Sequence, residues 1–156
     1  MSIRSATLKE AELLTQLASR SKAHWGYDDA FLQRCAPELQ VKTAEIRLNQ
    51  VFVIEHTLQI AGFYMFSPLS EQEVELTLFF IDPPFIGQGL GKRLFKHALQ
   101  QTRQRGFTQM FIQSDPFALP FYQKMGALLH SEKVSESTGR SLPLLLVHLE
   151  KIQKNN

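Results

Sequence analysis

Three glycines on alternate positions, Gly87, Gly89 and Gly91, form the stretch of this 156-residue chain whose residue types most directly suggest chemistry. A strand-like run ends just before them at Pro83, because proline lacks the N–H that a strand ladder needs, and a helical pattern begins just after them. Glycine lets a ligand approach the backbone closely, and the first turn of a helix offers N–H groups without intrahelical partners. Lys92 adds a positive charge in that turn. The pattern predicts a phosphate-binding loop, and a purely structural turn from strand to helix is the alternative.

Three kinds of anion-binding loop can be compared with this pattern. A P-loop, GxxxxGK[ST], requires glycine at position 86 and Ser or Thr at position 93, where the chain has Ile86 and Arg93. A dinucleotide-binding loop, GxGxxG, requires glycine at position 92, where the chain has Lys92. The pyrophosphate loop of acetyl-CoA enzymes, R/Q-x-x-G-x-G/A, matches at Gly89 and Gly91 but has Ile86 at its first position. The choice between them therefore depends on the rest of the chain.

The composition predicts a globular protein, and its mildly basic charge fits an anionic ligand. Hydrophobic residues make up 44% and charged residues 21% of the chain, which is enough to form a core. The net charge of +2 fits an anionic ligand but is too small to indicate nucleic acid as a partner. The single cysteine, Cys35, excludes an internal disulfide and a Cys-based zinc site, so we expect no metal and a reducing, cytoplasmic location. No apolar run has the length of a membrane span, so no membrane partner is expected.

The elements around the glycine loop alternate between strands and helices in one predicted domain, residues 1–150, followed by a polar tail, residues 151–156. Strand patterns cover residues 3–6, 51–56, 59–67, 73–81, 107–113, 127–135 and 144–150. Helical patterns follow the capping box 7–10 and cover 28–35, 43–50, the range that begins at 90 and stops at Gly106, and 116–125. In the first helix, Leu13, Leu14, Leu17 and Ala18 are expected on the buried face.

The segment between the first two helices gathers aromatic side chains. Ser21–Asp28 contains the single tryptophan, Trp25, with Tyr27 and His24 around a glycine. These rings could fill the core at a helix–helix bend. Alternatively they form the wall of a substrate pocket, where amphipathic rings contact a ligand.

Two stretches, in this order, resemble the motifs of the GNAT superfamily of N-acetyltransferases. The first is the glycine loop with its helix, residues 84–106. The second, residues 114–127, reads S-D-P-x-A-x-x-F-Y-x-x-x-G-A and is similar to the family's N-x-x-A-x-x-x-Y-x-x-x-G-F/A. The opening strand and capped helix also fit, so the resemblance covers nearly the whole chain. It implies an α/β (α+β) fold with a twisted, mixed, mainly antiparallel sheet, flanked by about four helices and splayed between the fourth strand, 73–81, and the fifth, 107–113.

The resemblance also implies acetyl-CoA as co-substrate, with its pantetheine arm in the gap between these strands. The residues carried over as cofactor-binding are Phe79 and Ile81 for pantetheine, Gly87, Gln88, Gly89, Leu90, Gly91 and Lys92 for pyrophosphate, Asp115, and Tyr122 beside the sulfur. Two positions depart from the family. Ile86 removes a side-chain contact to phosphate, and Asp115 places a carboxylate where the family has an amide.

Acetyl transfer to an amine explains which residue types the site would need. An amine must lose its proton before it attacks a thioester, and Glu75 is the candidate base, either directly or through a water. A backbone N–H near Phe79 could stabilise the developing oxyanion, and Tyr122 could protonate the leaving thiolate. The alternatives are that Glu75 is a solvated surface carboxylate and that Tyr122 is a core aromatic residue.

The acceptor is expected to be a small-molecule amine, with a peptide N-terminus or lysine as the alternative. Trp25, Tyr27, Phe63 and Arg140 are the candidate acceptor residues, and Arg140 would suit an anionic group. Dimers are common in such families, so the resemblance allows a homodimer. Two other functions are a non-catalytic acyl-CoA sensor and a structural domain without CoA. The presence of Glu75 and Tyr122 argues against the sensor, and the intact glycine loop argues against the structural domain.

Overall fold

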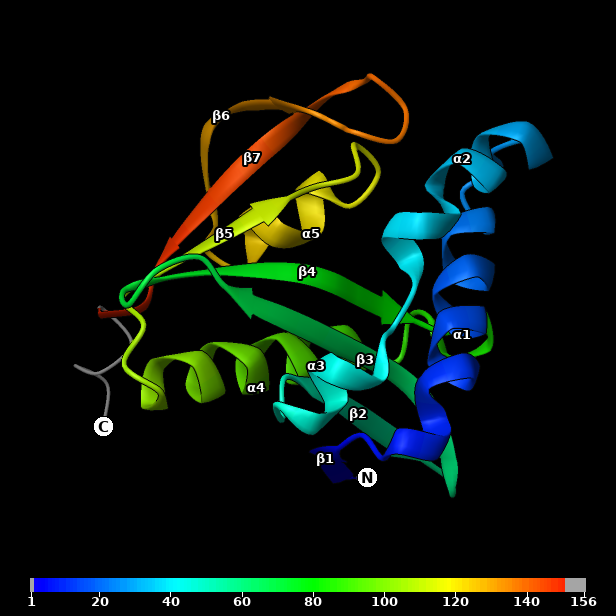
Figure 1. Cartoon of the computed structure of the whole chain (residues 1–156), viewed down its shortest axis with the longest axis horizontal. Coiled ribbons are helices and arrows are strands. Elements are labelled where there is room, and N and C mark those ends of the chain that lie inside the picture. The colour runs from blue at the N-terminus through cyan, green and yellow to red at the C-terminus, as the bar shows by residue number, and fades with distance from the viewer. Residues whose placement is uncertain (1, 151–156) are drawn as a thin grey trace.

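The computed structural model describes residues 2–150, which contain a seven-stranded sheet (Figure 1). The strands are β1 Ser2–Ser5, β2 Val51–His56, β3 Gln59–Pro68, β4 Glu73–Ile81, β5 Gln109–Gln113, β6 Leu128–Val134 and β7 Ser141–His148. Their spatial order is β1-β2-β3-β4-β5-β7-β6. The pair β4–β5 is parallel, and the other neighbouring pairs are antiparallel. The predicted mixed, mainly antiparallel sheet is confirmed.

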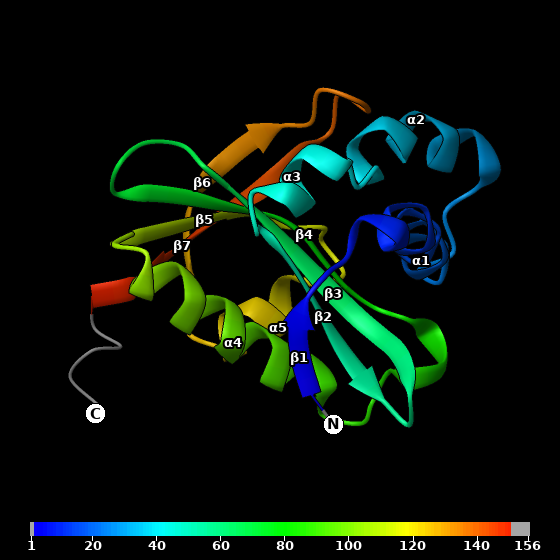
Figure 2. The ribbon, with the colours of Figure 1, turned by 60° about the horizontal axis from the view of Figure 1, so that its bottom comes forward.

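Helices cover both faces of this sheet (Figure 2). The α-helices among the described residues are α1 Ala11–Ala23, α2 Asp29–Leu39, α3 Thr43–Arg47, α4 Leu90–Gln104 and α5 Leu119–Lys124. The helices α4 and α5 pack on one face, and α1, α2 and α3 pack on the other. Each face therefore has its own apolar core, one under α4 and α5 and one under α1 to α3.

Strand β4 contributes side chains to both cores because its pairing with β3 is irregular. Val74 and Leu76 belong to the core under α4, whereas Leu78, two residues further on, belongs to the core under α1. The register shifts between them, since Phe66 pairs with Leu76 and Met65 pairs with Leu78. Thr77 is therefore the extra residue of a β-bulge, and bulges re-aim the side chains and backbone groups that follow them.

The sheet opens between β4 and β5. The two strands pair at three positions, from Glu73 opposite Gln109 to Glu75 opposite Phe111. Beyond Glu75, β4 remains paired with β3 as far as Ile81, while β5 remains paired with β7 as far as Gln113. The strands therefore diverge after Glu75, which confirms the predicted splay.

Four details of the helices differ from the predictions. Helix α2 continues to Leu39 instead of ending at Cys35, and α3 ends at Arg47 instead of Gln50. Leu13 is 46% exposed, because α1 buries the stripe formed by Leu14, Leu17 and Ala18 and Leu13 lies beside that stripe. The helix predicted to begin at residue 116 begins at Leu119. The Asp115 carboxylate accepts the N–H of Phe117 at 2.9 Å in a turn, and Pro120 occupies the first helical turn, where its missing N–H costs little. The predicted polar tail, residues 151–156, lies outside the described residues.

Candidate active site between strands β4 and β5

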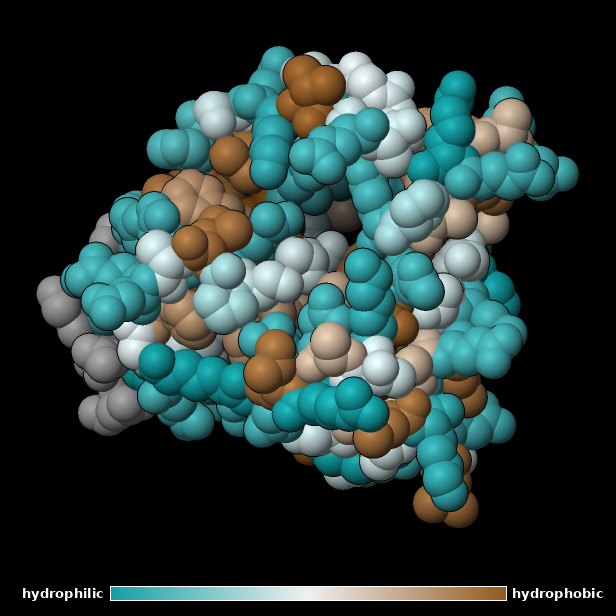
Figure 3. All heavy atoms as spheres, in the orientation of Figure 1, coloured by the Kyte–Doolittle hydropathy of each residue, from teal (hydrophilic) through white to brown (hydrophobic). Residues whose placement is uncertain are grey.

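A cavity of about 660 Å³ lies where β4 and β5 diverge. Its walls come from both cores, with Phe79, Leu90 and Tyr122 from the α4 side and Leu39 and Leu78 from the α1 side. The cavity therefore extends through the opening in the sheet. Figure 3 shows a hollow between the strands and the helix pair α1–α2.

One end of the cavity is the glycine loop. Gly87 and Gly89 have φ values of +86° and +79°, which side chains with a Cβ rarely adopt, and a Cβ at either position would meet no protein atom within 4 Å. The N–H of Arg93 donates the first helical hydrogen bond, to the oxygen of Gly89, so the preceding amide groups are left for another acceptor. Lys92 lines the cavity in this first turn. The loop has the open backbone and positive charge that a phosphate group requires.

The predicted cofactor residues are brought together along this cavity. Its lining includes Phe79, Ile81, Gly87, Gly89, Leu90, Gly91, Lys92, Asp115 and Tyr122, but not Gln88. Ile86 also lines it, at the position where the family has Arg or Gln.

Tyr122 lies on the wall of the cavity, between α4 and α5. Its side chain is almost fully buried, and its ring packs edge-on against Phe79 and obliquely against Phe95, at centroid distances of 6.1 and 5.7 Å. Within residues 2–150 its hydroxyl makes no hydrogen bond to protein, although it faces a cavity. Burial, and secondarily the charge of Asp115, raise the pKa of Tyr122, so the phenol stays protonated at neutral pH. It can therefore act as a proton donor.

Glu75 lies at the point where β4 leaves β5. It pairs with Phe111 and lines the cavity. Because strand residues alternate, its side chain lies on the face opposite to that of Val74 and Leu76, toward α1 and α2. Its carboxylate makes no ion pair among the described residues. Such a carboxylate is available to a ligand in the cavity.

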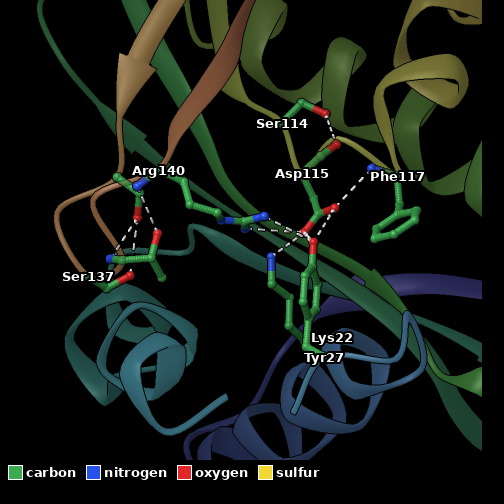
Figure 4. A network of polar contacts seen from close by, with 9 residues as sticks. Lys22, Tyr27, Ser114, Asp115, Phe117, Ser137 and Arg140 are labelled. Atoms are coloured by element: carbon green, nitrogen blue, oxygen red, sulfur yellow. Dashed lines mark hydrogen bonds and ion pairs between the residues drawn. The ribbon is translucent and has the colours of Figure 1, made fainter. Parts of the chain in front are cut away.

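The other end of the cavity holds a polar cluster centred on Asp115 (Figure 4). Lys22 Nζ lies 2.6 Å from Asp115 Oδ2, and the hydroxyl of Tyr27 donates to the same carboxylate at 2.9 Å. Arg140 Nη1 donates to the hydroxyl of Tyr27 at 3.2 Å. Burial alone would raise the pKa of Asp115, but the hydrogen bonds from Lys22 and from the N–H of Phe117 hold it below its usual value. Asp115 is therefore ionised at neutral pH. It contacts the predicted acceptor residues Tyr27 and Arg140, but neither of these two residues is part of the cavity wall.

The bend between α1 and α2 forms a wall of the cavity. Trp25 is 41% exposed, lines the cavity and stacks on Phe117, with 5.2 Å between ring centroids and 6° between planes. Helix α1 is also tied to the glycine-loop end, because Arg20 pairs with Asp82 through two hydrogen bonds of 3.2 and 3.0 Å. The structure thus favours the pocket-wall interpretation of this bend.

Phe63, also predicted as an acceptor residue, lies apart from this group. It is fully buried on β3 in the core under α1, next to Phe80, and is not part of the cavity wall. Sequence reasoning had missed Lys22 and Phe117. Lys22 lies in the aromatic segment Ser21–Asp28, and Phe117 lies in the second motif, residues 114–127. A lysine in a bend and a phenylalanine after a proline have many possible roles, so residue type alone did not indicate these two.

Comparisons with known proteins identify the family. The family model described as "Acetyltransferase (GNAT) domain" matches residues 10–139, which is most of the chain. The chain belongs to the GNAT family of acetyltransferases.

Two curated relatives and one solved structure are similar to this GNAT domain. It is 39% identical over 66 residues to a peptidyl-lysine N-acetyltransferase, YjaB, of Salmonella typhimurium. This match covers 42% of this chain and 44% of that protein. It is 33% identical over 54 residues to a glucosamine 6-phosphate N-acetyltransferase of Trypanosoma brucei brucei. This match covers 35% of this chain and 37% of that protein. The chain thus matches less than half the length of either relative. The PaiA N-acetyltransferase of Thermoplasma acidophilum, solved in complex with coenzyme A, superposes with a TM-score of 0.77 at 17% identity, over 94% of this chain and 98% of that one.

None of the helices within residues 2–150 has the length and apolar character needed to span a membrane. No group of three or more His, Cys, Asp or Glu side chains in that range is arranged to hold a metal ion.

Proposed function

We propose that this GNAT domain transfers the acetyl group of acetyl-CoA to a primary amine by direct attack, with both substrates bound in the cavity between β4 and β5. The observation that carries the proposal is the divergence of these strands after Glu75. This divergence leaves a cavity that runs from the open glycine loop, through the sheet, to the polar cluster at Asp115. An elongated ligand with a phosphate group at one end fits such a passage.

The residues of the cavity divide into a cofactor half and an acceptor half. The amide groups of residues 87–92, ahead of the first helical hydrogen bond, would hold the pyrophosphate, with Lys92 beside them. The free edge of β4 from Phe79 to Ile81 would bond the pantetheine amides, since β5 no longer pairs with it. The acceptor would enter from the side of α1 and α2, between Trp25 and Asp115.

Two side chains would then handle the protons. Glu75 would take a proton from the acceptor ammonium, directly or through a water, because its carboxylate faces the α1 side and has no ion pair within residues 2–150. The neutral amine forms a C–N bond to the acetyl carbon, the C–S bond breaks, and the attacking nitrogen gives its second proton to the oxygen of Tyr122, which replaces the proton that Tyr122 gives to the thiolate. Tyr122, kept protonated by burial, would give its proton to the departing thiolate. The backbone after the bulge at Thr77 would supply an N–H to the carbonyl oxygen near Phe79.

An assay that follows both products tests this proposal. Release of CoA thiol and acetylation of the acceptor are measured together over a panel of small amines and of peptides with free N-termini and lysines. We expect equal amounts of thiol and acetylated amine, with small amines as the better acceptors. Acetyl-CoA binding without transfer to any amine would support a sensor instead, and better transfer to peptides would overturn the small-molecule assignment.

A further inference from the structure

The charged side chains of the cavity wall divide between its two halves. Within residues 2–150 they are Lys22, Glu38, Glu75, Lys92, Asp115 and Lys124. Lys92 and Lys124 belong to α4 and α5, which pack on the same face of the sheet. The other four lie on the acceptor side, toward α1 and α2, so they set the charge that an acceptor meets.

These four groups and the neighbouring Arg140 leave one carboxylate unmatched, that of Glu75. Lys22 forms an ion pair with Asp115 at 2.6 Å. Arg140 is not part of the wall but lies 3.8 Å from the same carboxylate. Glu38 accepts a backbone N–H from the turn just before Arg140, at 3.1 Å. The two cations therefore balance Asp115 and Glu38, and Glu75 is left to bind one ammonium group.

Apolar side chains form much of the remaining wall on the acceptor side. Leu39, Leu78 and Leu142 line the cavity and are buried. Trp25 and Phe117 line it as well, and they are 41% and 52% exposed although both are large apolar residues. Their rings stack at 5.2 Å between centroids and present one aromatic surface. A ligand that covers such a surface gains free energy from the apolar area that it removes from water.

The hydrogen bonds of Asp115 hold Phe117 beside Trp25. The Asp115 carboxylate accepts the N–H of Phe117 at 2.9 Å, and it is itself held by Lys22 and by the hydroxyl of Tyr27 (Figure 4). The ring of Tyr27 also meets the ring of Phe117 edge-on at 5.9 Å. The aromatic pair is therefore ordered before a ligand binds, which lowers the entropic cost of binding. Asp115 acts here as a positioning residue for Phe117.

We propose that the acceptor is a primary amine with an apolar body and no second charged group, and that Trp25 and Phe117 bind this body. The inference rests on the proposed function, since it places the reacting amine at Glu75 in the same cavity. Glu75 then recognises the single charge of the acceptor, and the aromatic pair recognises its alkyl or aryl part. A second charge would lose its water beside a cluster whose charges are already balanced, which disfavours such acceptors.

A series of primary amines of increasing chain length tests the inference. The n-alkylamines from ethylamine to hexylamine have nearly equal basicity, so differences in kcat/KM report the apolar contact. We expect kcat/KM to rise about three- to fourfold for each added CH₂ until the chain has covered the aromatic pair. Hexylamine should also exceed 1,6-diaminohexane and 6-aminohexanoate, which have the same chain length and a second charge, by about tenfold or more.

Variants of the aromatic pair should reduce this dependence on chain length. In Trp25→Ala and in Phe117→Ala the gain for each CH₂ should fall toward one. Asp115→Ala should reduce the gain through Phe117, and Asp115→Asn, whose amide oxygen can still accept the N–H of Phe117, should restore part of it. The matched control is Leu69→Ala, because Leu69 is 53% exposed but is not part of the wall, and this variant should keep the wild-type gain. Thermal unfolding identifies folded variants, and Phe117→Ala decides if Trp25→Ala does not fold.

The outcomes separate this inference from the proposed function. A flat chain-length profile, or a preference for the diamine or the amino acid, would overturn the inference and leave acetyl transfer intact. Absence of transfer to every amine would overturn the proposed function. Calorimetric titration of ethylamine and hexylamine into the CoA-saturated protein would then decide the inference alone, since tighter binding of hexylamine supports it and equal binding overturns it. An equal gain for each CH₂ in wild type, Trp25→Ala and Phe117→Ala would also contradict it.

Discussion

Replacement of Tyr122 by phenylalanine removes one hydroxyl and leaves the packing of the ring. The ring contacts with Phe79 and Phe95 depend on carbon atoms that both residues share. The hydroxyl has no protein hydrogen bond to lose within the described residues, so its removal should change the free energy of unfolding by no more than about 0.5 kcal/mol. The effect on catalysis should be much larger, because the thiolate would lose its proton donor.

The expected loss in kcat for Tyr122→Phe is ~10²–10⁴-fold, the usual contribution of general acid catalysis. This corresponds to about 2.7–5.4 kcal/mol in the transition state, several times the change in stability. The assay measures thiol release under saturating substrates, with thermal unfolding and calorimetric CoA binding on the same preparations. The melting temperature and the CoA affinity of the variant should match those of wild type.

Because burial raises the pKa of Tyr122, the wild-type phenol stays protonated on both sides of neutral pH. The loss in the variant should therefore be similar from mildly acidic to mildly alkaline conditions. An unchanged kcat with a lower melting temperature would refute the reasoning. Tyr122 would then be a core residue, and the thiolate would be protonated by water or by the acceptor.

Three further substitutions probe other parts of the cavity. Gly89→Val should abolish CoA binding in a folded protein, because a branched side chain would stand where phosphate meets the backbone; calorimetry measures this binding. The control is Gly106→Val, which should keep CoA binding, since Gly106 has a comparable φ of +97° and equally open space around it. Trp25→Ala should raise the acceptor KM and leave the KM of acetyl-CoA nearly unchanged. Unfolding of the variant would assign Trp25 to the core, and an effect confined to the KM of acetyl-CoA would assign it to the cofactor site. Glu75→Gln should lose activity at neutral pH and recover part of it in alkali, where the amine deprotonates without help; a pH–rate profile like that of wild type would require another base.

Local sequence patterns were sufficient to predict most of the fold. The strand 73–81 and the glycine loop after it were recognised from alternation, proline and glycine alone, and the structure places them there. The start of α5 could not be predicted in this way. Asp115 and Pro116 are a typical helix start, but the Asp115 side chain closes a separate turn on Phe117 before the helix begins at Leu119.

Contacts between distant parts of the chain were beyond the reach of these patterns. The ion pair of Lys22 with Asp115 joins residues 93 positions apart, so nothing local distinguishes Lys22 from other lysines. Phe63 shows the converse problem. An aromatic residue in a strand near the cleft suits both a pocket and a core, and the pairing of β3 with β4 places it in the core. The resemblance to the GNAT superfamily supplied the splay of the sheet, which the register after Glu75 confirms.

A crystal structure of the protein with CoA bound would test the central claim most directly, namely that the opening between β4 and β5 is the acetyl-CoA site. We predict that the pyrophosphate lies against the amide groups of residues 87–92, that the pantetheine pairs with the free edge of β4 near Phe79, and that the sulfur lies beside the hydroxyl of Tyr122. CoA bound away from the glycine loop, or a cavity left empty at saturating CoA, would contradict the account.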